Sequence, residues 1–346
     1  MFTTSKRNAK FEFVRVIAMV LVLFYYITKA FPLNDGLNHS GLVFSVFSVF
    51  YKLAAPLFLL LCGRFALNLD FSNKSLKEFY FKKMVYILIP MLFFMTFQYF
   101  LDFTDNINDF NFFSFLPFLT AAYNNLHYWF MYDALFYILS APILSLAFKD
   151  ISDRGVISFV SIGLIYSICY FYIPLIPEAG FSYSNQFGKL IFYFFLGGVS
   201  DRFTNIIGKK KLYIAGAVSF IVVVLQTRIL ESYTERYDAS PFYVIFTLAL
   251  YIFLTSLYKE GNKYTDKTLL FLGKYSFYVC MIQGILMKRI VDYGILPTDN
   301  FWLFVSEGTA IVLVASVVLS VLIDTIIFRF LRICLYHLFS VYNNIK

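Results

Sequence analysis

Charged residues are scarce in this chain, and their scarcity excludes a soluble globular protein. Only 14% of the 346 residues are Asp, Glu, Lys or Arg, whereas 60% are hydrophobic and the mean hydropathy is +0.71. A soluble core of this length cannot hide so much apolar surface. The chain is therefore predicted to be an integral membrane protein.

Cysteine and histidine are also rare. The four cysteines, Cys62, Cys169, Cys280 and Cys334, fall in or beside apolar runs and form no CxxC pair, so we expect reduced, packed thiols. The sequence has three histidines, and it contains neither a metal-ligand cluster nor a glycine-rich phosphate loop. We expect no bound metal and no bound cofactor.

Long apolar runs dominate what is present. Ten of them have about the length that a helix needs to cross a bilayer, roughly 20 residues, without the apolar–polar alternation of membrane β-strands. We predict an all-α integral membrane protein, a bundle of about ten transmembrane helices in one domain over residues 1–346. The predicted spans are 13–33, 42–67, 85–101, 128–148, 155–176, 187–200, 212–230, 241–258, 269–290 and 301–327.

Basic residues between the spans predict the orientation. With the N-terminus inside, the outer segments hold only Lys29, Arg228, Arg236, Lys288 and Arg289 out of 29 Lys and Arg residues, and most of the others face the cytoplasm. This asymmetry follows the positive-inside rule, so both termini are predicted to be cytoplasmic. The same rule accounts for the net charge of +8. We expect membrane lipids, and no nucleic acid, among the partners.

The first span carries a polar stripe. Tyr26 and Lys29 follow Arg15 by eleven and fourteen residues, which places all three on one face of a helix. Arg15 and Tyr26 are about 16 Å apart along that helix, at about 1.5 Å per residue. The stripe is a candidate functional face. The alternative is that Arg15 and Lys29 extend to the headgroups at the two membrane surfaces.

Acidic residues inside spans are a second candidate group, because lipid does not tolerate a charge without a partner or a water-filled cavity. Asp133 and Glu307 lie near the outer ends of their spans, where they form either a polar pocket or ion pairs with Lys29, Lys288 or Arg289. Gln283 is the third candidate residue of that pocket. Proline and glycine residues within the spans predict features of helix packing. Pro56, Pro90 and Pro142 are expected to kink three helices, and Gly197 with Gly198 to permit close approach of a neighbour.

Six segments, in order along nearly the whole chain, resemble the acyltransferase-3 family. They are FVRVIAMVLVLFYYITKAF, APLFLLLCGRFAL, FKKMVYILIP, HYWFMYDALFYILSAPIL, FYFFLGGVSDR and LGKYSFYVCMIQGIL. The resemblance implies a bacterial inner-membrane, multi-pass O-acyltransferase. Such enzymes use acyl-CoA, commonly acetyl-CoA, as co-substrate and acylate sugars of surface polysaccharides and other extracytoplasmic glycans.

The resemblance also implies site residues. Arg15 matches the family's first-helix Arg, but Tyr26 stands where the family has a His, and Gln283 stands where many members have a second His. Histidine has a pKa suited to a general base, whereas an unperturbed tyrosine, with a pKa near 10, does not. Either Tyr26 is activated by Arg15 or Lys29, or another group serves, or catalysis is lost.

Three further residues complete the predicted site. His127 opens the fourth span at its outer end, where it either contacts the sugar acceptor or caps the interface beside Tyr128 and Trp129 in an aromatic belt. Lys82 and Lys83 begin the third span, where they either attract the phosphates of CoA or only set the topology.

These observations predict an acyl-CoA-dependent O-acyltransferase that acts on an extracytoplasmic glycan. The alternative is a non-catalytic relative that binds or translocates a glycan or a lipid-linked sugar, because both family histidines are missing and transporters use similar charged, kinked helices. A partner-binding membrane subunit is a third reading. Binding of acyl-CoA separates the first two.

Overall fold

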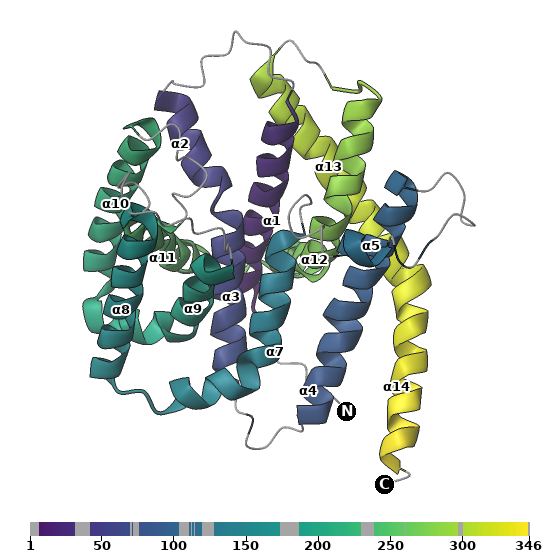
Figure 1. Cartoon of the computed structure of the whole chain (residues 1–346), viewed down its shortest axis with the longest axis horizontal. Coiled ribbons are helices and arrows are strands. Elements are labelled where there is room, and N and C mark those ends of the chain that lie inside the picture. The colour runs from purple at the N-terminus through teal and green to yellow at the C-terminus, as the bar shows by residue number, and fades with distance from the viewer. Residues whose placement is uncertain are drawn as a thin grey trace. The chain divides into compact units, whose positions relative to one another are not determined.

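The computed structural model consists of helices throughout its described residues (Figure 1). Each predicted span coincides with one or two helices in the described residues. The description covers residues 7–31, 42–69, 71, 76–103, 111, 113, 115–119, 128–173, 187–229, 239–259, 261–296 and 300–344.

The chain divides into two compact units. Unit 1 comprises the described parts of Met1–Tyr25, Pro32–Asp70 and Phe136–Gly273. Unit 2 comprises those of Tyr26–Phe31, Phe71–Leu135 and Lys274–Lys346. The boundary falls within three helices, α1 (Ala9–Ala30), α7 (Trp129–Lys149) and α12 (Lys263–Asp292).

Unit 1 is organised around the pairing of α3 and α9. At the two crossing points a glycine of one helix meets a backbone carbonyl of the other: Gly63 faces that of Phe194, and Gly197 faces that of Leu60. No side chain fits at either position, so the missing Cβ atoms allow the close packing that membrane helices use in place of a hydrophobic driving force. The expectation for Gly197 is confirmed. Helix α3 spans Ala54–Leu67 and α9 spans Phe187–Ile207. Unit 1 also contains α2 (Leu42–Tyr51), α8 (Asp153–Tyr172), α10 (Lys209–Ile229) and α11 (Pro241–Leu257).

Unit 2 contains two long helices that each include a π-helical turn. The first runs through α4 (Leu76–Lys83), η1 (Met84–Leu88) and α5 (Ile89–Phe103), and the second through α13 (Phe301–Ile323), η6 (Asp324–Phe328) and α14 (Arg329–Asn344). Phe328 of η6 is buried against Phe93 and Phe94 of α5 and Tyr278 of α12, with ring centroids 5.3 to 6.0 Å apart. This aromatic cluster joins three helices of the unit.

The helices have the dimensions of membrane spans. Eight helical segments in the described residues are long and apolar enough to cross a bilayer, and α11, with 17 residues, is a shorter apolar helix. Large apolar side chains such as Ile143, Leu146 and Ile229 are more than two-thirds exposed, as expected for residues that face lipid. The chain is thus an all-α multi-pass membrane protein, whereas the cytoplasmic location of its termini stays a prediction.

Several predicted boundaries differ from the structure. The span 42–67 is interrupted after α2, because Pro56 has no N–H to donate to the carbonyl of Lys52 four residues earlier. The third segment begins at Leu76, and the last continues to Asn344. Both extensions are less apolar than a span, and hydropathy therefore missed them.

Candidate active site

Arg15 is held by an acidic residue that the sequence reading overlooked. Its Nη1 donates hydrogen bonds to both carboxylate oxygens of Glu12, at 2.8 and 2.7 Å. Glu12 is almost fully buried and lies against Gly273 of α12, where a Cβ atom would collide with the carboxylate. Since both contacts use Nη1, Nε and Nη2 of Arg15 have no described partner and remain as donors for a ligand. The sequence signal for this ion pair is the three-residue spacing between Glu12 and Arg15 in an apolar helix.

The second half of the stripe belongs to unit 2. α1 is continuous through Tyr26 and Lys29, so the predicted helix is confirmed, with Tyr26 half-buried and Lys29 exposed. Packing fixes this end of the helix: Ile27 contacts Gly308 of α13, and the ring of Phe31 meets that of Phe304 edge-on at 5.1 Å. The catalytic roles of Tyr26 and Lys29 stay predictions.

The start of α7 is anchored to α12. The hydroxyl of Tyr128 donates a hydrogen bond to the carbonyl of Met281 at 3.2 Å, and the Tyr128 side chain is fully buried. The assignment of Tyr128 to an interfacial aromatic belt is therefore wrong. His127 lies outside the described residues.

Three buried polar side chains of unit 2 come from α5, α7 and α12. Asp133 and Gln283 are each 1% exposed, and Gln98, which the sequence reading did not single out, is 4% exposed. Neither atom of the Gln283 amide has a hydrogen-bond partner among the described residues. Glu307, by contrast, lies on an exposed face of α13. The buried polar group therefore contains two of the three predicted pocket residues and one new one.

The cations proposed as partners of Asp133 and Glu307 have other contacts. Lys288 forms an ion pair with Asp102 at 2.7 Å, and Arg289 donates to the carbonyl of Leu101 at 3.0 Å. These contacts tie the end of α12 to the end of α5.

The predicted donor-binding lysines lie in the last turn of α4. Lys82 forms an ion pair with Glu78 at 2.5 Å, and Nζ of Lys83 lies 5.3 Å from the ring centroid of Phe79. Both side chains are part-exposed. Lys82 and Glu78 have the four-residue spacing that is common for ion pairs on a helix surface, and such a pair contributes little to stability.

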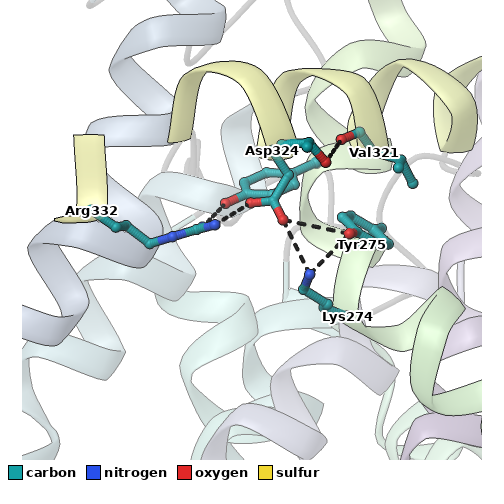
Figure 2. A network of polar contacts seen from close by, with 7 residues as sticks. Lys274, Tyr275, Val321, Asp324 and Arg332 are labelled. Carbon is teal, nitrogen blue, oxygen red and sulfur yellow. Dashed lines mark hydrogen bonds and ion pairs between the residues drawn. The ribbon is translucent and has the colours of Figure 1, made fainter. Parts of the chain in front are cut away.

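An ionic cluster in unit 2 surrounds Asp324, the first residue of η6 (Figure 2). Lys274 Nζ lies 3.1 Å from Oδ2 of Asp324, and Arg332 Nη2 lies 2.7 Å from Oδ1. Figure 2 shows the two cations reaching different oxygens of the carboxylate, and the hydroxyl of Tyr275 lies 3.4 Å from Oδ2. The sequence placed Asp324 in a span but did not identify its partners, because Lys274 is 50 residues away.

The described residues hold no group of three or more His, Cys, Asp or Glu side chains positioned for a metal ion. The polar side chains within the described helices include Arg15 with its partner Glu12, the buried amides and the ionic cluster around Asp324. The fold defines the class as a multi-pass α-helical membrane protein. The chain belongs to the acyltransferase-3 family, whose model, described as an acyltransferase domain, matches residues 8–325. Searches of curated proteins and of solved structures find no match.

Proposed function

We propose that the chain transfers an acyl group, acetyl in particular, from cytoplasmic acyl-CoA to a hydroxyl group of an extracytoplasmic glycan in the bacterial inner membrane. The observation that carries the proposal is Arg15, a family residue whose guanidinium is oriented by buried Glu12. A cation this close to the start of a span is well placed to bind acyl-CoA, which is an anionic acyl donor. Lys82 and Lys83 add positive charge for the phosphates of CoA.

The proposed reaction joins one hydroxyl to one thioester. The hydroxyl oxygen of the sugar attacks the thioester carbonyl carbon, the C–O bond of the ester forms, and the C–S bond breaks. The hydroxyl proton ends on the departing CoA thiolate. Negative charge develops on the carbonyl oxygen on the way, and a fixed hydrogen-bond donor stabilises it.

Tyr26 supplies that donor in our proposal. A tyrosine hydroxyl is protonated at neutral pH and is a poor general base, but it donates a hydrogen bond well. Lys29, one turn further along α1, adds positive charge on the same face. His127 is assigned to the acceptor.

Substitution of Tyr26 tests the proposal. Tyr26→Phe removes the hydroxyl with little change in volume, and we expect at least a tenfold loss of transfer, about 1.4 kcal/mol. Tyr26→His should keep or raise activity, because it restores the family's residue. Tyr25→Phe is the matched control, since it removes a hydroxyl from the adjacent residue, about 100° around the helix.

The assay is transfer of labelled acetyl from acetyl-CoA to glycan in native membranes, at matched protein levels. Full activity of Tyr26→Phe would make Tyr26 a packing residue. If both the parent and Tyr26→His bind no acyl-CoA and transfer nothing, the non-catalytic glycan binder replaces the enzyme.

A further inference from the structure

Gly273 of α12 belongs to unit 1, and the place where its side chain would be is occupied by Glu12 of α1. A Cβ atom added to Gly273 would overlap with Oε2 of Glu12, and it would lie 2.9 Å from Cδ and 3.1 Å from Cβ of the same residue. The three nearest heavy atoms of the surrounding structure thus all belong to Glu12. Both residues are buried, with Glu12 only 3% exposed. The glycine therefore provides the space that the carboxylate fills.

The Glu12 carboxylate holds the guanidinium group that the proposed function assigns to the donor. Nη1 of Arg15 donates to both carboxylate oxygens, and Nε of Arg7 lies 4.0 Å from Oε1. The side chain of Arg15 is 24% exposed and that of Arg7 is 49% exposed, so both cations are accessible although the carboxylate that they share is buried. A displacement of the carboxylate would therefore change the orientation of the Arg15 guanidinium.

We propose that Gly273 is a positioning residue for the acyl-CoA donor, and that it acts through Glu12 on the guanidinium of Arg15. The inference rests on the proposed function, in which Arg15 binds the anionic donor, and it adds a residue of a second helix to that site. A side chain at position 273 would push the flexible end of Glu12 aside, and Arg15 would lose its fixed orientation. Fixing a long side chain before the ligand binds contributes roughly threefold to tenfold to affinity.

Titration of the purified protein with a non-hydrolysable acetyl-CoA analogue is the measurement. We expect Gly273→Ala to raise Kd by roughly threefold to tenfold. Glu12→Asp should also raise Kd, because its shorter side chain no longer packs against Gly273. The double variant Gly273→Ala with Glu12→Asp should bind more tightly than either single variant. The shorter side chain leaves room for the Cβ atom, and the Cβ atom fills the space that the shorter side chain vacates.

Two controls separate positioning of Arg15 from packing. In an Arg15→Gln background, Gly273→Ala should leave Kd unchanged, because no guanidinium remains to be oriented. Gly216→Ala in α10 is the matched glycine substitution in unit 1. Its Cβ atom would overlap with that of Ala249 in α11, which cannot rotate away, so the thermal midpoint should fall. The Kd of Gly216→Ala should equal that of the parent.

The outcomes decide between the inference and the proposed function. A Kd of Gly273→Ala equal to that of the parent would overturn the inference alone. If Gly273→Ala does not fold, the double variant is compared with Glu12→Asp, and a double variant that binds no better, or does not fold, would overturn the inference. A parent that binds the analogue but transfers no acyl group would refute the proposed function and leave the positioning role of Gly273 standing. A parent that binds no acyl-CoA would refute both.

Discussion

The ion pair between Asp324 and Arg332 is the more buried half of the ionic cluster in unit 2. The side chain of Asp324 is 5% exposed and that of Arg332 is 17% exposed, whereas Lys274 is 50% exposed. Breaking a buried ion pair by removing one partner costs about 3 to 5 kcal/mol, and a solvent-accessible pair contributes about 0 to 1 kcal/mol. The two cations of one carboxylate should therefore differ in their effect on stability.

Asp324→Asn keeps the shape of the side chain but leaves two cations without their counter-ion. We expect a loss of about 3 kcal/mol in the free energy of unfolding. Arg332→Met should cost a similar amount, because it leaves a buried carboxylate with one partly exposed lysine. Lys274→Met should cost no more than about 1 kcal/mol.

The double variant Asp324→Asn with Arg332→Met tests the pairing itself. Because neither charge then remains buried alone, its cost should be smaller than the sum of the two single costs by about 1 to 3 kcal/mol. The measurement is reversible unfolding by SDS in mixed micelles, followed by loss of helical circular dichroism. Equal costs for Lys274→Met and Arg332→Met, or additive single costs, would refute the reasoning from burial.

Two further predictions concern the donor and the topology. Neutralising Lys82 and Lys83 should weaken the binding of a non-hydrolysable acyl-CoA, measured by titration, and the loss should be larger at low salt. Neutralising the lysines at 209–211 is the control and should not weaken binding. Equal effects of the two sets would leave Lys82 and Lys83 only a role in topology. In a thiol-free background, a cysteine introduced at Gly261, before α12, should be shielded from an impermeant reagent in intact cells. A cysteine introduced at Asp292, at the end of α12, should react. Labelling at Gly261 would reverse the predicted orientation of the chain in the membrane.

The positions of the helices follow from the sequence, because a run of apolar residues of bilayer length has few alternatives to a helix. Hydropathy does not detect the parts of a helix that extend beyond a membrane span. The ring of Phe81 on α4 stacks on that of Phe339 on α14 at 4.1 Å, so these two extensions support each other in unit 2. Their pairing depends on contacts between segments more than 200 residues apart, which a window along the chain does not register.

The candidate site was predictable only where its parts are local. Periodicity places Arg15 and Tyr26 on one helix, and the Glu12–Arg15 spacing carries a signal for their ion pair. The partners of Asp324 come from another helix and from the next segment, and no local pattern indicates them. Burial is equally invisible, since Gln98 and Glu307 are both polar residues in apolar runs, yet the first is buried and the second is exposed.

The polar groups of unit 2 differ in where their partners are. Asp324, Lys274 and Arg332 satisfy one another within the protein, so their chemistry supports the fold. Gln283 is buried with no hydrogen-bond partner for its amide among the described residues, so no such bond ties it to the fold. Nine residues of α12, about 14 Å, separate Lys274 from Gln283, and the aromatic contacts of Tyr278 lie between them. Because effects of sites this far apart usually add, a substitution at Asp324 and a substitution at Gln283 should change the free energy of unfolding independently of each other.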